Sequence, residues 1–497
     1  MAKTIKFRLD GTAVEALEGE TVLEAAERAG LRIPHYCWHK ALGNPGNCRM
    51  CVVEVEGAPK PQAACRLPAK EGLVVRSASP ASRRAQSAAL ELHLVDHPLD
   101  CPVCDQAGEC GLQDYYMDIG RYPSAMREDK AHAAKRVPVG PHIMLDQERC
   151  ILCTRCARFV SQVSKSHELG IFGRGHNEAV ALVPGRVLDN PYSGCLADVC
   201  PVGALTDRDF RFQVRVWYLD GADSVCPGCS RGCGIRVHTS TRRPWHNKGR
   251  RLARLKPRFT EVNGHWICDE GRYGYADFDT DRLGKVMRLK DPSAELGWDV
   301  VCDEVAVAIR QGMLKDPAGL AVVASGGLSN EDWRAFRSLF VDALKLERFL
   351  FAPEPDQVGE QDELLRRRDK VPNLEGGKAA GFGTQIKSLD WDGLAGEIES
   401  GKVWGLYVVD RDPVKVWGER GRALAEGLSL LVCQGPRKGL TGGLAHYRLP
   451  ATDWLEEAGS FTNFQGQVQT YLPALKPLGA ARPDWDIFSA LEKAVNG

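Results

Sequence analysis

Residues 150–156 read CILCTRC, and this short stretch holds three cysteines, Cys150, Cys153 and Cys156, with two residues between each pair. The chain has 18 cysteines in 497 residues, and 16 of them precede residue 270. Disulfide scaffolds are small secreted domains, so clustered cysteines at C-x2-C spacing in a chain of this length indicate metal binding. We therefore expect this segment to fold around a metal centre.

The fourth ligand of this centre is expected far along the chain. Two-cluster bacterial ferredoxins use the run C-x2-C-x2-C-x3-C-P, in which the last cysteine binds the other cluster. Here that last position is Val160, and a Cys-Pro pair occurs instead at Cys200. Reading the run backwards from Cys200 gives three positions without cysteine: Asn190, Ser193 and Leu196. We expect a ferredoxin domain that has lost one cluster and keeps one 4Fe–4S cluster, with Cys195 an ordinary buried thiol. By its order along the chain we call this the third of four sites, and its predicted ligands are Cys150, Cys153, Cys156 and Cys200.

Residues 97–110, HPLDCPVCDQAGEC, supply three cysteines of a second site: Cys101, Cys104 and Cys110. His97 stands four residues before the first of them, and Pro98 favours a loop at this point, from which the histidine can turn back. Imidazole can replace thiolate on iron and usually raises the potential. The alternatives are an incidental histidine or a Cys3His zinc site. His93, one helical turn upstream, is expected to pack in the interior.

The first site of the chain consists of Cys37, Cys48, Cys51 and Cys65. Residues 4–19 read as two strands joined by an Asp-Gly turn, and a short amphipathic helix follows that Thr21 caps and Gly30 ends. Residues 38–50 are rich in Gly, Asn and Pro, so that backbone N–H groups can face an anionic cluster. This layout resembles β-grasp ferredoxins with a 2Fe–2S cluster. Zinc is the alternative, but only one C-x2-C pair occurs here.

Residues 226–233, CPGCSRGC, begin a fourth site, which consists of Cys226, Cys229, Cys233 and the distant Cys268. The tight C-x3-C member favours a 4Fe–4S cluster over zinc, which prefers two C-x2-C pairs. Residues 241–258 lie in between and hold eight Lys or Arg and no acid. We expect most of this run to be a solvated basic face. The alternatives are that it offsets an anionic cluster, meets an acidic partner or binds nucleic acid.

The four sites account for nearly every cysteine. They use 15 cysteines and His97, and they leave Cys195, Cys302 and Cys433. Complete four-ligand sites with so few leftovers are hard to reach by accident. His97 is therefore predicted to be the fourth ligand of the second site.

In this order the four sites resemble the large iron–sulfur subunit of bacterial NADH-quinone oxidoreductase, respiratory complex I. Residues 459–469, GSFTNFQGQVQ, are also similar to a stretch of that family, with Gln465 and Gln467 in place of its usual acid and arginine. The resemblance implies a 2Fe–2S cluster at the first site and 4Fe–4S clusters at the other three. It implies these ligands: Cys37, Cys48, Cys51, Cys65; His97, Cys101, Cys104, Cys110; Cys150, Cys153, Cys156, Cys200; Cys226, Cys229, Cys233, Cys268.

The fold class predicted is multidomain α+β. Residues 319–327, 403–410 and 428–435 are apolar runs ending in Gly or Asp, which are typical of parallel strands. Ser329 or Asn330 is expected to cap the helix after the first run, Cys433 to be buried, and Cys302 to lie on an amphipathic helix. The predicted domains are a 2Fe–2S β-grasp domain (1–80), a His/Cys3 segment (81–140), a degenerate two-cluster ferredoxin domain (141–215), a 4Fe–4S domain of molybdopterin-oxidoreductase type (216–275) and a shortened α/β molybdopterin-oxidoreductase-like region (276–497). No molybdopterin is expected there.

By the same resemblance the chain is an electron-relay subunit of a proton-translocating enzyme, without catalytic residues or substrate chemistry of its own. The partners implied are an FMN- and NADH-binding subunit, a small 2Fe–2S subunit and quinone-side hydrophilic subunits. The location implied is peripheral, on the cytoplasmic side of the plasma membrane. One alternative is the electron-input subunit of an NAD-dependent formate dehydrogenase or hydrogenase. Another is a zinc-built scaffold without a redox role.

Composition limits the other classes. The chain is 43% hydrophobic and 26% charged, and Lys plus Arg equals Asp plus Glu at 65 each, so no global field favours nucleic acid. No apolar run reaches about 18 residues, and the N-terminus lacks the apolar core of a secretory signal. We expect contact with a membrane only through partner subunits.

Overall fold

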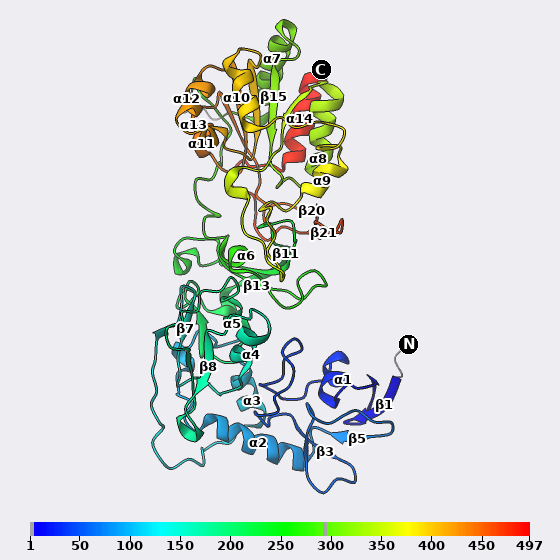
Figure 1. The fold of residues 1–497 in the computed structure, drawn as a ribbon, viewed down its shortest axis with the longest axis vertical. Helices are drawn as coiled ribbons and strands as arrows, with labels where there is room; N and C mark the ends of the chain where they lie inside the picture. The colour runs from blue at the N-terminus through cyan, green and yellow to red at the C-terminus, as the bar shows by residue number, and fades with distance from the viewer. Residues whose placement is uncertain (1–3, 292–295) are drawn as a thin grey trace. The chain divides into compact units, whose positions relative to one another are not determined.

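The computed structural model describes residues 4–291 and 296–497. The chain divides into two compact units, one up to Leu219 and one from Asp220 onward (Figure 1). None of the helices in the described part of the chain combines the length and the apolar character that crossing a membrane requires.

The first unit begins with a sheet in the order β2-β1-β5-β3-β4. Its strands are β1 (Thr4–Leu9), β2 (Thr12–Leu17), β3 (Val52–Val55), β4 (Gln62–Ala63) and β5 (Val74–Arg76). The predicted hairpin is confirmed, because β1 and β2 are antiparallel and Asp10 and Gly11 between them both have positive φ, at 48° and 86°. Thr21 caps the N-terminus of helix α1 (Val22–Arg28) and forms a capping box with Glu24. Gly30 follows the end of the helix with a φ of 72°.

The sheet and α1 enclose one hydrophobic core, to which alternate residues of β1 and β2 contribute: Phe7, Leu9, Val14 and Ala16. Cys51 and Cys65 belong to the same core, at 1% exposure each. Two of the four ligands predicted for the first site therefore belong to the hydrophobic core of the β-grasp domain.

The remainder of the first unit consists of short elements around the second and third sites. The helices are α2 (Pro80–Leu94), α3 (Gly111–Ile119), α4 (Arg155–Gln162) and α5 (Cys195–Val199), with 3-10 turns at Cys101–Val103, Gly175–Asn177 and Val216–Tyr218. The strands are β6 (Val137–Pro138), β7 (Ile143–Leu145) and β10 (Leu205–Asp207) in one sheet and β8 (Leu169–Phe172) and β9 (Ala179–Leu182) in a hairpin. Helix α2 ends before His97, as Pro98 predicts.

The second unit opens with the sheet β11 (Asp220–Val225), β12 (Gly234–Thr239) and β13 (Leu252–Pro257), followed by α6 (Asp269–Tyr273). The expectation of a solvated basic face over residues 241–258 is wrong for its second half. β13 pairs with β12 and buries Leu252, Ala253 and Leu255; since adjacent residues of a strand point to opposite faces, this part of the strand is covered on both. Arg251 forms ion pairs with Asp279 and Glu456, at 2.7 and 2.8 Å.

The rest of the second unit is a doubly covered sheet in the order β14-β19-β18-β17-β15-β16 (Figure 1). Its strands are β14 (Met287–Arg288), β15 (Leu320–Ala324), β16 (Arg348–Leu350), β17 (Gly405–Val409), β18 (Leu430–Gly435) and β19 (Tyr447–Pro450), with a separate hairpin of β20 (Gly459–Thr462) and β21 (Val468–Tyr471). As predicted, β15, β17 and β18 are parallel, and Cys433 is buried in β18.

Helices cover both faces of this sheet. They are α7 (Trp298–Lys315), α8 (Asn330–Phe336), α9 (Leu374–Ala379), α10 (Trp391–Glu399), α11 (Pro413–Trp417), α12 (Glu419–Glu426), α13 (Gly439–Leu444) and α14 (Asp484–Asn496), with a π-helix at Arg337–Ala343 after α8. In β15, Leu320 and Val322 pack towards α7, α8 and α14, whereas Ala321 and Val323 pack towards α10, α11 and α12. Ser329 caps α8, and Cys302 is buried on α7, as predicted.

Candidate metal centres

The four cysteines of the first site are buried in the β-grasp domain, each at 4% exposure or less. The backbone N–H of Cys37 donates to the sulfur of Cys48 at 3.4 Å. A hydrogen bond from the Cys48 thiol lowers the pKa of Cys37, and the backbone N–H groups of Gly46 and Asn47 act in the same direction. The loop therefore presents donors to sulfur, which is the arrangement that an anionic cluster requires.

The other two thiols of this site also adjoin one another. The Cys65 thiol raises the pKa of Cys51 through a hydrogen bond, and burial adds to that effect. Cys51 immediately precedes β3, and Cys65 follows β4, so strand pairing brings them together. The site thus contains two sulfur pairs, Cys37 with Cys48 and Cys51 with Cys65.

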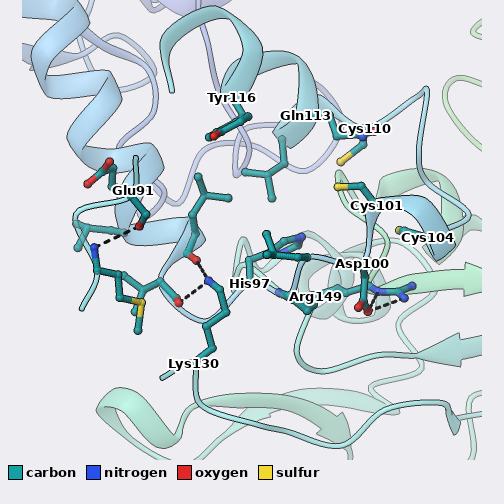
Figure 2. A pocket seen from close by; sticks show the side chains of 18 of the residues that line it. Glu91, His97, Asp100, Cys101, Cys104, Cys110, Gln113, Tyr116, Lys130 and Arg149 are labelled. Atoms are coloured by element: carbon teal, nitrogen blue, oxygen red, sulfur yellow. Dashed lines mark hydrogen bonds and ion pairs between the residues drawn. The ribbon is translucent and has the colours of Figure 1, made fainter. Parts of the chain in front are cut away.

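His97 and the three cysteines of the second site line one cavity of about 620 Å³ (Figure 2). Nδ1 of His97 is buried and has no hydrogen-bond partner among residues 4–291 and 296–497. Burial lowers the pKa of His97 to about 4, and the positive charges of Lys130 and Arg149 act in the same direction. The imidazole is therefore neutral at pH 7, which is the form that binds metals. This buried and unpartnered nitrogen fits a ligand better than a surface histidine.

The cysteines of the second site lie in or next to two short elements. Cys101 begins a 3-10 turn and is exposed, whereas Cys104 follows that turn and Cys110 precedes α3, and both of these are buried. Burial raises the pKa of Cys104 and of Cys110. Arg149 lies beside this site and donates to Asp100 Oδ2 at 2.8 and 3.0 Å (Figure 2).

His93, the competing histidine, has a different role. It lies near the end of α2, and its Nε2 contacts the carbonyl oxygen of Cys48 at 2.9 Å. Its ring packs edge-on against Tyr36, with centroids 5.2 Å apart. His93 therefore has a packing role, as predicted. The sequence did not indicate that it packs against the first site or that it contacts the backbone of Cys48.

All four cysteines of the third site line one small cavity. Leu152 and Thr154 adopt positive φ, at 50° and 65°, so that the loop between Cys150 and Cys156 turns sharply before α4. Burial is the main cause that raises the pKa of Cys150, Cys153 and Cys200 to about 11, and neighbouring thiolates add to it. Burial disfavours the thiolate form here, and a bound metal would supply the positive charge that stabilises it.

The positions of the lost cluster are filled by packing. Val160, Asn190, Ser193 and Leu196 are all buried. Asn190 Nδ2 donates to Glu168 Oε1 at 3.1 Å, so the buried amide of Asn190 has a hydrogen-bond partner. Cys195 is fully buried at the start of α5, as expected of an ordinary thiol.

The fourth site joins a hairpin to α6. Cys226 follows β11 and Cys233 precedes β12, and the Cys226 N–H donates to the Cys233 carbonyl oxygen at 2.8 Å. Cys268 caps α6 by accepting from the N–H of Gly271 at 3.4 Å. A β-carbon at Gly271 would stand 2.9 Å from the Cys226 sulfur and 3.5 Å from the Cys268 sulfur, so glycine is required where these two ligands meet.

Two segments of the C-terminal region cover the fourth site, and we call residues 364–370 and 459–469 the cover. Phe464 N–H donates to Ser230 O at 2.9 Å, and Gln469 Nε2 donates to Gly232 O at 2.7 Å. Arg231 Nε donates to Leu365 O at 3.0 Å. The resemblance singled out 459–469 without locating it, and nothing in the sequence indicated 364–370.

A separate cavity of about 490 Å³ lies beyond the parallel strands of the second unit. Four buried carboxyl groups line it: Asp332, Asp453, Glu457 and Asp484. Burial raises the pKa of each of them. The lining also includes Lys370 and Arg437, but carboxyl groups outnumber these two cations, so the cavity does not fit the phosphate of a molybdopterin. Among the described residues, no three His, Cys, Asp or Glu side chains are arranged to hold a single metal ion.

Comparisons with known proteins match the same segments. Family models match as follows: a 2Fe-2S iron-sulfur cluster binding domain at residues 2–80, the NADH-ubiquinone oxidoreductase-G iron-sulfur binding region at 86–124, the ferredoxin-like domain of NADH-quinone oxidoreductase subunit 3 at 140–206, and molybdopterin oxidoreductase at 378–494. The predicted fold class, with its 2Fe–2S, 4Fe–4S, ferredoxin-like and molybdopterin-oxidoreductase-like parts, is confirmed.

Individual relatives agree with these models. The NADH-quinone oxidoreductase G subunit of Streptomyces coelicolor is 35% identical over 398 residues, which are 78% of this chain and 46% of the relative. The mitochondrial NADH dehydrogenase [ubiquinone] iron-sulfur protein 1 of Solanum tuberosum is 40% identical over 289 residues, 58% of this chain and 37% of the relative. A crystal structure of an NAD+-reducing [NiFe]-hydrogenase in the H2-reduced state matches at 36% identity, over 43% of this chain and 91% of that one, with a TM-score of 0.39. The chain spans about half the length, or less, of the curated relatives it matches, and over that part it is similar to NADH-quinone oxidoreductase G subunits.

Proposed function

We propose that this chain is the electron-relay iron–sulfur subunit of a proton-translocating NADH-quinone oxidoreductase. The observation that supports this most strongly is the second site, where a neutral and unpartnered imidazole shares one cavity with three cysteines. Iron–sulfur clusters supply reversible one-electron transfer when bound. The first site would hold a 2Fe–2S cluster and the other three sites one 4Fe–4S cluster each, on the sixteen ligands predicted from the sequence.

The chain's own residues would hold, insulate and tune these groups. In the first site, the sulfur pairs Cys37 with Cys48 and Cys51 with Cys65 suit the two metal positions of a binuclear cluster. Backbone N–H groups directed at sulfur stabilise negative charge there. In the third and fourth sites every cysteine except Cys150 is buried, which would limit the access of water to the thiols.

The wider assignments belong to the same proposal. The partners would be an FMN- and NADH-binding subunit, a small 2Fe–2S subunit and quinone-side hydrophilic subunits, and the chain would be peripheral on the cytoplasmic side of the membrane. The five domains would be residues 1–80, 81–140, 141–215, 216–275 and 276–497. The hydrogenase and formate dehydrogenase alternative expects both ferredoxin clusters, which the packed Val160, Asn190, Ser193 and Leu196 disfavour.

Metal analysis of the full chain, purified without oxygen, tests this function. We expect about fourteen irons per chain, two at the first site and four at each of the others, with a matching amount of labile sulfide. Reduction should produce distinct paramagnetic signals for binuclear and tetranuclear clusters. Protein that is colourless and contains about one zinc per site would support the zinc scaffold and overturn the proposal.

The partner assignment has its own test, which is isolation of the native assembly from the source cell. Co-purification of an FMN-bearing subunit together with quinone-side subunits is the expected result. An FMN-bearing subunit with a hydrogen- or formate-activating subunit in place of the quinone side would favour the alternative.

A further inference from the structure

Arg158 extends from α4, in the third site, to the loop of the first site. Its Nη1 donates to the carbonyl oxygens of Leu42 and Gly43, at 2.5 and 3.0 Å. Its Nη2 donates to the carbonyl oxygen of Cys37, a ligand of the first site. Its Nε donates to Thr154 Oγ1 at 3.1 Å, which fixes the guanidinium relative to its own helix. One side chain thus holds the glycine-rich loop at three points.

Two further side chains repeat this connection. Arg155 Nη2 donates to the carbonyl oxygen of Trp38 at 2.6 Å, next to Cys37, and its Nη1 donates to that of Val199 at 3.4 Å, next to Cys200. In the opposite direction, Asn47 Nδ2 donates to the carbonyl oxygen of Leu152 at 2.9 Å. The contacts with Trp38 and Leu152 each join a residue beside a ligand of the first site to a residue beside a ligand of the third, whereas the contact with Val199 lies within the third site.

The position of Arg158 also matters for charge. It donates to the carbonyl oxygen of Cys37 and follows Cys156 by two residues on α4, so its charge lies beside a predicted ligand of each site. A guanidinium stays charged and offers several donors in a fixed plane. One cation can therefore stabilise negative charge on either side of it and hold the backbone at the same time.

We infer that Arg158, assisted by Arg155, is a positioning residue that couples the first and third sites. It fixes the loop of the first site against α4, and its positive charge is shared by both sites, so the two reduction potentials are set together. This inference rests on the proposed function, since it requires a cluster at each of these sites. It assigns no chemistry to the arginine itself.

The test uses the full chain, loaded with iron and sulfide without oxygen, and measures both potentials by paramagnetic resonance during a redox titration. The variants are Arg158→Gln, which removes the charge, and Arg158→Lys, which keeps it. Arg186→Gln is the matched control, because Arg186 is exposed and donates to one carbonyl, that of Ser166. We expect Arg158→Gln to lower the reduction potentials of both clusters. The expected change is about tenfold in the equilibrium constant for reduction, or about 59 mV for a one-electron couple.

A second readout separates charge from anchoring. Arg158→Lys should leave both potentials near those of the wild type, yet it should raise amide hydrogen exchange in residues 37–43, because a lysine cannot hold three carbonyls in one plane. Arg186→Gln should change neither quantity. A shift of only one potential, of neither, or an equal shift in Arg186→Gln would overturn the inference.

If Arg158→Gln loses a cluster, the two potentials are measured in Arg155→Gln instead. A joint shift of both potentials in that variant supports the coupling, and unchanged potentials contradict it. Failure of the proposed function looks different, because the wild-type chain itself would then contain no iron at these two sites.

Discussion

Gly203 lies directly against the sulfur of Cys104, since a β-carbon added at Gly203 would stand 2.2 Å from Cys104 Sγ. Gly203 follows Cys200 of the third site by three residues, whereas Cys104 belongs to the second site. The backbone of one ligand segment therefore forms part of the wall behind a ligand of the other. Gly203 also lines the cavity of the second site.

Gly203→Ala should selectively impair the second site, because the new methyl group would displace the Cys104 sulfur. We expect up to about four irons fewer per chain and a loss of about 1–3 kcal/mol in the free energy of unfolding from overpacking. Iron and sulfide analysis and thermal unfolding measure the two effects. Gly396→Ala is the control, since that position in α10 has open space, and it should keep all irons. A full iron content in Gly203→Ala would contradict the prediction.

The candidate ligands could be named from the sequence because a cluster needs ligands at short and repeated intervals, and such intervals are visible in it. The sharp loop from Cys150 to Cys156, the Asp10–Gly11 turn and the parallel strands β15, β17 and β18 could also be predicted. In each case local backbone chemistry determines the structure. For Gly203, the one local signal is its place three residues after a ligand cysteine.

The contacts between segments were not predictable. Arg158 reaches Cys37, and Gln469 reaches Gly232, over separations of 121 and 237 residues. Nothing in the neighbourhood of either residue distinguishes it from an ordinary surface side chain. The prediction of a solvated basic face at 241–258 was wrong for a related reason, since the number of charges does not reveal that part of the run pairs as β13.

His97→Cys should retain a 4Fe–4S cluster at the second site with a lower reduction potential, because a thiolate adds negative charge where a neutral imidazole stood. His97→Ala should leave one ligand position open and give a labile cluster. Redox titration of the paramagnetic signals checks both. His93→Ala serves as the control and should leave the second-site potential unchanged, because His93 contacts Cys48 of the first site. An unchanged potential in His97→Cys would remove His97 from the ligand set.

The carboxyl groups of the acidic cavity should make the chain less stable as pH rises. Burial raises the pKa of Glu457 to about 10, and Asp332 and Asp484 add to this effect. A pKa that is higher in the folded state favours folding below the unfolded value, near 4.5, and this contribution is lost as pH rises towards about 10. Glu457→Gln should therefore raise the free energy of unfolding by about 1 kcal/mol or more at pH 8 and change it little at pH 4.

Urea unfolding of the full chain across this pH range provides the measurement. Glu419→Gln is a suitable control, because Glu419 is an exposed glutamate of the same unit, and its pH profile should match that of the wild type. An effect of Glu457→Gln that is equal at pH 4 and pH 8 would show that the glutamate is ionised in the folded chain.

Gln469→Ala should open the cover over the fourth site. Gln469 donates to the carbonyl oxygen of Gly232, which lies between Cys229 and Cys233, and an unpaired buried carbonyl costs about 1–3 kcal/mol. We therefore expect iron release from the fourth site to a chelator to become roughly tenfold faster, since about 1.4 kcal/mol corresponds to a factor of ten. The other three clusters should release iron at the wild-type rate. Gln465→Ala tests an exposed glutamine of the same segment and should have no effect. Equal acceleration at all four sites would mean that the variant loosens the whole chain, whereas unchanged release would mean that the hydrogen bond to Gly232 does not retain the cluster.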